Sequence, residues 1–240
     1  MPSSPSRQDR LSRLIAKPFA HRGLHGPGRV ENSRAAFEAA IAAGHGIELD
    51  VRAIMYGEAI VFHDDRLDRL TDHQGPVHVL ELVDLEQVRL KGSDETIPTL
   101  SEILALVGGK APLLVELKAP RRDADWLSPG VAAALSRYKG PAAVMSFNPE
   151  VSRWFARHAP NVLRGLVVTE QDKGLRGLWE RPLSLWWAKP DFLAYDIRDL
   201  PSRFAAAAGL PVLTWTVRSQ DDRARAAQFA DQIIFEAFPA

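Results

Sequence analysis

The chain contains 240 residues, of which 46% are hydrophobic and 25% are charged, and its 30 basic residues balance its 30 acidic ones. These proportions are typical of a globular protein, and the zero net charge excludes an overall field that would draw the chain to nucleic acid. The absence of cysteine from the sequence excludes disulfides, thiolate zinc sites and a cysteine nucleophile.

The N-terminal stretch Met1–Lys17 is rich in serine and arginine and lacks the apolar core of an export signal. No apolar run in the sequence reaches the roughly 18 residues that a membrane-spanning helix needs. We therefore expect a cytoplasmic protein without stable membrane insertion.

Short β-like runs alternate with longer helical runs along the chain. This order predicts a parallel sheet, because parallel strands need helical crossovers between them. Eight such runs favour a closed (β/α)8 TIM barrel, which typically needs about 250 residues, over an open sheet. We expect one domain over residues 1–240. The predicted strands are Pro18–His21, Gly46–Arg52, Leu113–Leu117, Ala142–Phe147, Arg164–Thr169, Phe192–Ile197, Val212–Val217 and Gln232–Glu236.

Helical stretches connect the predicted strands. The pattern lacks a helix after the last strand, so the periodic segment Arg10–Ala16 is predicted to form a helix that covers this gap from the N-terminal side. The predicted connecting helices are Ser33–Ala43, Thr99–Val107, Val131–Tyr138, Pro149–Arg157, Leu175–Trp187, Pro201–Ala208 and Gln220–Phe229.

Several helix starts carry capping signals. Thr99 and Glu102 have the spacing of a capping box. Pro129 and Pro149 each follow a capping residue, which predicts proline at the first position of a helix.

One stretch, Asp64–Pro98, has no clear βα order and is predicted to hold a short helix near Glu81–Leu90. The apolar run Ala59–His63 precedes it and is predicted to extend the second strand through a bend or a hairpin.

Two carboxylates, Glu48 and Asp50, lie inside the second predicted strand. Side chains alternate along a strand, so both point to the same face. Two like charges on one inward face repel each other and are costly to bury unless a positive charge lies between them. A hard divalent cation such as Mg²⁺ or Ca²⁺ fits, because it prefers oxygen ligands.

Polar side chains also end the neighbouring strands. His21 and Arg22 end the first strand, and His63 closes the extension of the second. Glu116 and Lys118 end the third strand with the same two-residue spacing. Because (β/α)8 enzymes carry their active sites at the carboxyl ends of the strands, we expect these side chains to converge.

A cation among carboxylates, flanked by histidine, arginine and lysine, suits the cleavage of a phosphodiester. The cation and an arginine would neutralise the phosphate oxygens. One histidine would take a proton from the attacking oxygen and the other would give one to the leaving alcohol. Such acid–base help is worth roughly 10²–10⁴-fold in rate, and histidine suits it because its ordinary pKa is about 6.5.

An ordered series of motifs runs from residue 18 to the C-terminus. Any single motif is weak, but the order and spacing of the set are specific. The segments are Ala20-His21-Arg22-Gly23, Glu31-Asn32-Ser33 with Phe37 and Ala40, Gly46-Ile47-Glu48-Leu49-Asp50-Val51, Val61-Phe62-His63-Asp64, Leu67-Asp68-Arg69-Leu70-Thr71, Ile97-Pro98-Thr99-Leu100, Glu116-Leu117-Lys118, Ser146-Phe147 and Trp215-Thr216-Val217.

This series resembles the glycerophosphodiester phosphodiesterase family. The resemblance implies a (β/α)8 barrel that releases glycerol 3-phosphate from small glycerophosphodiesters with a divalent cation, Mg²⁺ or Ca²⁺. It also implies a glycerol hydroxyl as internal nucleophile. The roles that it implies are metal binding for Glu48, Asp50 and Glu116, acid–base catalysis for His21 and His63, and phosphate binding for Arg22 and Lys118.

Three further residues are candidates for the substrate pocket, each with a structural alternative. Asn32 either reaches the substrate or caps the helix that follows. Glu31 either touches the substrate or braces Arg22. Trp215 either forms a wall of the pocket or fills the barrel core.

The chain departs from the family pattern at three places. Val30 stands where the family usually has proline, and Arg218 stands where it usually has asparagine. The last strand, Gln232–Glu236, replaces the common Gly-Ile-x-Thr-Asp. These departures leave the proposed ligands and histidines intact and concern the substrate contacts of the seventh and eighth strands.

Two other functions are compatible with the sequence. A lysophospholipase D would use the same site on lipids that keep an acyl chain, and it would need an apolar groove, which Trp179, Trp186 and Trp187 could supply. A barrel that binds a phosphodiester without cleaving it is the other hypothesis, against which the intact set of ligands and histidines argues. Head-group preference and oligomeric state have no signature in the sequence.

Overall fold

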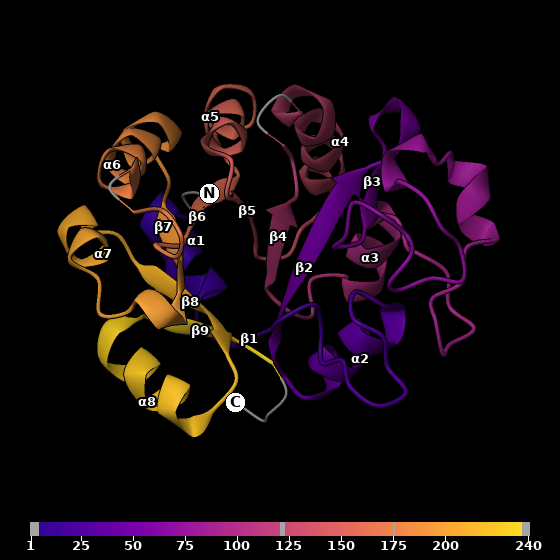
Figure 1. The fold of residues 1–240 in the computed structure, drawn as a ribbon, viewed down its shortest axis with the longest axis horizontal. Helices are drawn as coiled ribbons and strands as arrows, with labels where there is room; N and C mark the ends of the chain where they lie inside the picture. The colour runs from indigo at the N-terminus through magenta and orange to yellow at the C-terminus, as the bar shows by residue number, and fades with distance from the viewer. Residues whose placement is uncertain (1–4, 121–122, 175, 237–240) are drawn as a thin grey trace.

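The computed structural model describes residues 5–120, 123–174 and 176–236, and within them eight parallel strands close into a barrel (Figure 1). β1 (Phe19–Ala20) pairs with β2 (Gly46–Ala53) on one side and with β9 (Gln232–Phe235) on the other, which closes the ring. The (β/α)8 prediction is therefore confirmed. The other barrel strands are β4 (Leu113–Leu117), β5 (Ala142–Ser146), β6 (Leu163–Val168), β7 (Phe192–Asp196) and β8 (Val212–Val217).

Helices surround the barrel on its outer side (Figure 1). None of the helices in the described residues is both long and apolar enough to span a membrane. Leu175, where one predicted helix begins, lies outside the described residues. The outer helices are α2 (Arg34–Ala42), α3 (Leu100–Val107), α4 (Ala124–Ser136), α5 (Pro149–His158), α6 (Arg176–Ala188), α7 (Arg203–Ala208) and α8 (Gln220–Phe229), with a short 3₁₀ helix η4 (Ile197–Asp199) after β7.

Strand residues alternate between the helix layer and the barrel interior. On β2, Ile47, Leu49 and Val51 are buried in the apolar layer between the strands and the helices. Glu48 and Asp50 take the alternate positions and face inward, as the period of two requires. The main core thus lies outside the strands, and the interior face is free to carry polar groups.

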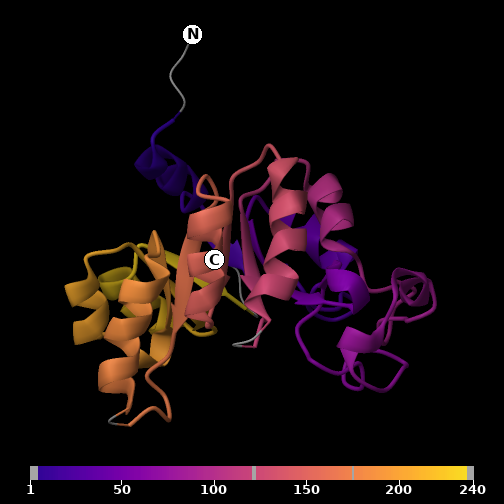
Figure 2. The same cartoon turned by 90° about the horizontal axis from the view of Figure 1, so that it is seen from above.

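The N-terminal helix α1 (Arg7–Leu14) lies across the amino-terminal end of the barrel (Figure 2). Leu11 and Leu14 are buried among inward-facing strand residues such as Leu114 and Phe192. The predicted helix is confirmed, but its position differs from the prediction. It closes one end of the barrel instead of filling a gap in the outer ring, because its apolar side chains pack on the barrel interior.

The segment after β2 carries the largest addition to the barrel. β3 (Ala59–Val61) pairs antiparallel with β2, so the predicted extension is a hairpin, with the 3₁₀ turn η1 (Met55–Gly57) between the strands. Residues 62–98 pack with Ile54 and Ile60 of the hairpin in a satellite apolar cluster at the end of the barrel opposite α1 (Figure 2). The predicted short helix exists there as the 3₁₀ helix η3 (Leu82–Glu86), after the 3₁₀ turn η2 (Val77–Val79).

Two of the predicted helix caps are confirmed. Thr99 accepts a hydrogen bond from the backbone N–H of Glu102, whose side chain in turn accepts one from the backbone N–H of Thr99 at 2.7 Å. Asn148 caps α5 by accepting a hydrogen bond from a backbone N–H, and Pro149 occupies the first helical position. Both caps satisfy backbone donors that have no partner within the helix.

The predicted start of α4 is wrong. Pro129 does not begin this helix but lies inside it, because the helix starts at Ala124. Ala124, Leu127 and Val131 are buried on one face, so the apolar period continues across the proline. Burial of that face outweighs the backbone hydrogen bond that proline removes.

The packing of α1 predicts a specific loss of stability. Leu14 is fully buried, so Leu14→Ala should reduce the free energy of unfolding by about 2–5 kcal/mol, because the cavity would be only partly filled by relaxation. Leu183→Ala is the matched control, because Leu183 is 63% exposed on α6 and its loss should change stability by less than about 0.5 kcal/mol. Urea denaturation followed by circular dichroism measures both. Equal responses would contradict a sealing role for α1.

Candidate active site

Three acidic side chains meet inside the barrel near the carboxyl ends of β2 and β4. Glu48 and Asp50 share one face of β2, and the strand register places Asp50 beside Glu116 of β4. Their exposed fractions are 1%, 0% and 6%, respectively. One oxygen of each residue lies within 4.8 Å of the others. The fold therefore gathers three buried carboxylates at one point.

Two cationic side chains compensate part of this charge. Lys118 Nζ lies 2.5 Å from Glu116 Oε1 and 3.0 Å from Asp50 Oδ1, and Arg22 Nε lies 3.2 Å from Asp50 Oδ2. Burial alone would raise the pKa of the Asp50 carboxyl, but the charges of Lys118 and Arg22 hold it below its usual range. The two cations therefore favour the charged form of Asp50.

The turn after β1 aims Arg22 at the acidic cluster. Arg22 has φ 56° and Gly23 has φ 79°, so two successive residues adopt left-handed backbone. A Cβ on Gly23 would lie 2.9 Å from Ala36 of α2, which makes glycine the residue that fits here. The resulting turn directs the backbone N–H of Arg22 to Glu48 Oε2, at 3.0 Å.

Asn32 is buried against Asp50. Its side-chain amide donates to Asp50 Oδ2 at 2.9 Å, and its oxygen accepts from the backbone N–H of Asp50 at 3.2 Å. The cap of α2 is Ser33, so the capping alternative for Asn32 is wrong. In this structure Asn32 orients a carboxylate from behind and does not line the cavity.

Glu48 is the least compensated of the three carboxylates. Its Oε1 atom is buried and has no hydrogen-bond partner among the described residues. Burial and the nearby charge of Asp50 raise the pKa of Glu48 to about 8. An unpartnered buried oxygen is costly, and a cation among the three residues would supply the missing positive charge. A donor set made only of carboxylate oxygens fits Mg²⁺ or Ca²⁺.

Each predicted catalytic histidine is held by its own carboxylate. His21 Nδ1 lies 2.9 Å from Glu236 Oε2, and His63 Nδ1 lies 2.7 Å from Asp64 Oδ1. Burial alone would lower the pKa of His21, but the hydrogen bond to Glu236 raises it. Burial lowers the pKa of His63. Two histidines with oppositely shifted pKa values can divide the acid and base roles between them.

Glu31 and Arg69 join the two sides of the site. Glu31 Oε1 accepts from Arg22 Nη1 at 2.7 Å and from Arg69 Nη2 at 2.8 Å. Arg69 Nε also donates to Asp64 Oδ2 at 2.6 Å, and this bond holds the pKa of Asp64 at about 2. Glu31 therefore braces Arg22 in this structure, which is one of its two predicted alternatives.

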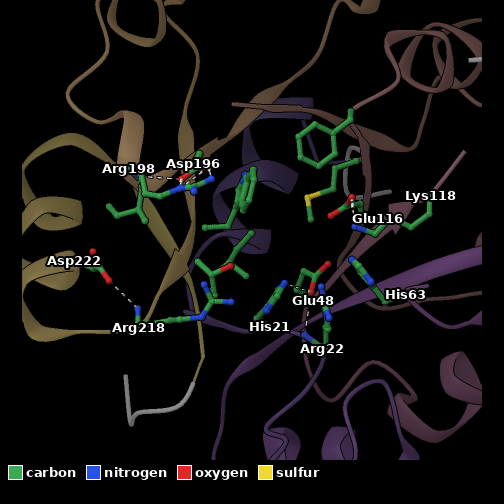
Figure 3. A pocket seen from close by; sticks show the side chains of 16 residues that line it. His21, Arg22, Glu48, His63, Glu116, Lys118, Asp196, Arg198, Arg218 and Asp222 are labelled. Carbon is green, nitrogen blue, oxygen red and sulfur yellow. Dashed lines mark hydrogen bonds and ion pairs between the residues drawn. The ribbon is translucent and has the colours of Figure 1, made fainter. Parts of the chain in front are cut away.

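A cavity of about 430 Å³ opens beside the carboxylates (Figure 3). Trp215 lines its wall and donates from Nε1 to the carbonyl of Ala194 at 2.9 Å, while Phe147 packs edge-on against it. Trp215 thus lines the cavity and also packs against the apolar layer of the barrel interior, so both of its structural alternatives apply in part. The lining residues are His21, Arg22, Glu48, His63, Glu116, Lys118, Met145, Phe147, Asp196, Ile197, Arg198, Trp215, Thr216, Arg218, Asp222 and Ile234.

Sequence reasoning missed several polar groups of this site. Asp196 ends β7, and its two carboxylate oxygens accept hydrogen bonds from Nε and Nη2 of Arg198, so its strand-end position was an available signal. Glu236 follows Ile234 by two residues, and strand alternation marks both as inward-facing. Arg218 lines the cavity although alternation along β8 does not predict it.

Comparisons with known proteins agree with this geometry. A family model described as the glycerophosphoryl diester phosphodiesterase family matches residues 21–236. A glycerophosphodiester phosphodiesterase of Caldanaerobacter subterraneus is 29% identical over 221 residues, covering 86% of this chain and 88% of that protein. A probable glycerophosphodiester phosphodiesterase 2 of Mycobacterium tuberculosis is 38% identical over 203 residues, covering 82% and 71%.

Solved structures have the same fold. A phosphodiesterase of Oleispira antarctica, determined in complex with the product sn-glycerol-3-phosphate, superposes with a TM-score of 0.80 at 24% identity and covers 95% of this chain and 94% of its own. A glycerophosphodiester phosphodiesterase of Thermotoga maritima gives a TM-score of 0.70 at 23% identity, with coverage of 90% and 92%.

The pair of His63 and Asp64 predicts a measurable shift. Asp64→Asn keeps a side chain of the same shape but removes the charge that stabilises the protonated imidazole, so the pKa of His63 should fall further below its ordinary value. Histidine resonances followed by NMR during a pH titration measure it. Glu86→Gln, an exposed change on η3, serves as the control. An unchanged pKa of His63 would contradict the pairing.

Proposed function

The chain belongs to the glycerophosphoryl diester phosphodiesterase family, and on this premise we propose that it hydrolyses small glycerophosphodiesters to an alcohol and sn-glycerol 3-phosphate. The observation that carries the proposal is the meeting of three buried carboxylates and two carboxylate-held histidines at one cavity. Acidic, cationic and imidazole groups at that one place are the parts that cleavage of an anionic diester needs.

A divalent cation, Mg²⁺ or Ca²⁺, belongs to the proposal. Glu48, Asp50 and Glu116 would hold it, and the unpartnered Oε1 atom of Glu48 supports this assignment. When bound, the cation supplies positive charge for the phosphate oxygens and for the carboxylates together. Asn32 would keep Asp50 oriented toward it, as a partner behind a metal ligand does.

Arg22 and Lys118 would bind the phosphate. Both line the cavity, and both reach it from beside the carboxylates. Arg22 has N–H groups beyond those that contact Asp50 and Glu31, and a guanidinium can present them to phosphate oxygens in pairs. Lys118 would act as a point charge on the same group.

His21 and His63 would move the protons. Because the Nδ1 atom of each is engaged by a carboxylate, Nε2 is the atom left for transfer on each ring. One histidine would accept a proton from the attacking hydroxyl and the other would donate one to the leaving oxygen. Glu236 and Asp64 would keep the rings in the orientation that this transfer needs.

A small, water-soluble diester suits the cavity better than a lysolipid. The alternative of a lysophospholipase D required an apolar groove supplied by Trp179, Trp186 and Trp187. All three side chains lie on α6, where Trp179 is 82% and Trp186 is 64% exposed, and none of the three lines the cavity. The aromatic groups beside the cavity are Trp215 and Phe147.

Turnover should require both the cation and the histidines. Wild-type protein should release glycerol 3-phosphate from glycerophosphocholine with Mg²⁺ or Ca²⁺, and EDTA should abolish the release. His21→Ala should lower kcat by roughly 10²–10⁴-fold because one proton transfer is lost. An enzyme-coupled assay for glycerol 3-phosphate measures the rates.

His73→Ala is the matched control, because His73 also contacts a neighbouring aspartate through Nδ1 but lies outside the cavity. Its rate should equal that of the wild type. Turnover that persists in EDTA would contradict the metal assignment. Tight binding of the diester without turnover in any divalent cation would support the non-catalytic alternative.

Cation binding itself should depend on Glu48. Titration calorimetry of the protein with Mg²⁺ or Ca²⁺ should show one site, and Glu48→Gln should weaken it by more than the roughly 10- to 100-fold that loss of an outer partner produces. The substitution keeps the shape of the side chain but removes its charge. Equal affinity in the wild type and in Glu48→Gln would place the cation elsewhere.

A further inference from the structure

We propose that Arg218 is a positioning residue for His21 and that it acts through Glu236. The inference rests on the proposed function, because it assigns to Arg218 a part in holding a histidine of that site. The three residues directly follow β8, β9 and β1, which are consecutive neighbours in the barrel, and in Figure 3 the Arg218 side chain extends toward His21.

The contacts form a continuous chain. Arg218 Nη2 donates to Glu236 Oε2 at 2.8 Å, and the same oxygen lies 2.9 Å from His21 Nδ1. Backbone hydrogen bonds fix the residues that make these contacts. The N–H of Glu236 donates to the carbonyl of Val217 at 3.0 Å, and the N–H of His21 donates to the carbonyl of Phe235 at 2.9 Å.

An irregularity of β8 turns Arg218 toward the cavity. Thr214 pairs with Ile233 but Val217 pairs with Phe235, so β8 has one more residue than β9 over this stretch. Val217 consequently packs in the outer apolar layer, and Arg218 lines the cavity. Bulges of this kind commonly re-aim a side chain beside an active site. The backbone of Arg218 is held as well, because its backbone N–H donates to Asp222 Oδ2 at 3.1 Å.

The charges define what each member does. The hydrogen bond from His21 keeps the pKa of Glu236 at about 2, so Glu236 is a carboxylate that only accepts hydrogen bonds. Nδ1 of His21 must therefore carry the proton of this bond, which leaves Nε2 for transfer.

A second histidine competes for Glu236. His25 Nε2 lies 3.9 Å from Glu236 Oε1. Arg218 binds the oxygen on the side of His21 and thereby holds the carboxylate in that orientation. Arg218 and Glu236 are also two positions at which the sequence departs from the family pattern, and the two departures contact each other.

A double-mutant cycle tests the relay. With glycerophosphocholine and the divalent cation, Glu236→Gln should lower kcat about 100-fold and Arg218→Gln about 10-fold, with little change in KM. Adding Arg218→Gln to Glu236→Gln should cause no further loss, because Arg218 acts only through that carboxylate. Arg218→Lys should recover most of the rate. Arg157→Gln, an exposed change on α5, should leave kcat unchanged.

Effects that multiply in the double variant, or a loss that falls on KM, would overturn the proposal, because Arg218 would then act on the substrate directly. The ¹⁵N resonances of His21 provide a readout that needs no turnover. Both single variants should move them away from the form that carries hydrogen on Nδ1, and unchanged resonances would overturn the relay. A wild type that turns over no glycerophosphodiester would instead refute the proposed function, and the ¹⁵N measurement would still decide the relay.

Discussion

Repulsion among three buried carboxylates is the constraint that the other groups of the site must compensate. Glu48, Asp50 and Glu116 lie inside the barrel with oxygens within 4.8 Å of one another, so each must be compensated or lose its charge. Lys118 and Arg22 provide two cations from neighbouring strand ends. The negative charge that these two cations do not compensate is concentrated at Glu48, where a divalent cation would neutralise it.

The two ends of the barrel differ, and this difference allows the carboxylates to be buried together. At the amino-terminal end, Leu11 and Leu14 of α1 pack with inward strand residues into a dry interior layer. The carboxylates lie on top of that layer, with Leu114 below Glu116 on the same strand face. The three carboxylates are buried, so interactions between their charges are stronger there than in open solvent.

The fold and the acidic cluster could be predicted because both depend on short-range periodicity. Alternation placed Glu48 and Asp50 on one face, and the βα order indicated the barrel. The misses have other causes. Pro129 suggested a helix start because proline is common at the first position of a helix. The helix nevertheless continues through Pro129, because its buried face packs against residues distant in the sequence, which local signals do not reveal. Strict alternation from Trp215 would turn Arg218 outward, and only the bulge against β9, set by tertiary pairing, reverses it.

The two histidines show a common arrangement reached from unrelated parts of the chain. Each donates to a carboxylate, and each carboxylate is held from behind by an arginine: Glu236 by Arg218 and Asp64 by Arg69. An ionised partner orients the ring and stabilises its protonated form, and an arginine keeps that partner ionised. The two arginines differ in their further contacts. Arg69 continues through Glu31 to Arg22, whereas Arg218 ends at the cavity wall. A change at Arg69 would therefore affect both the carboxylate that holds His63 and the one that braces Arg22, whereas a change at Arg218 would affect the carboxylate that holds His21.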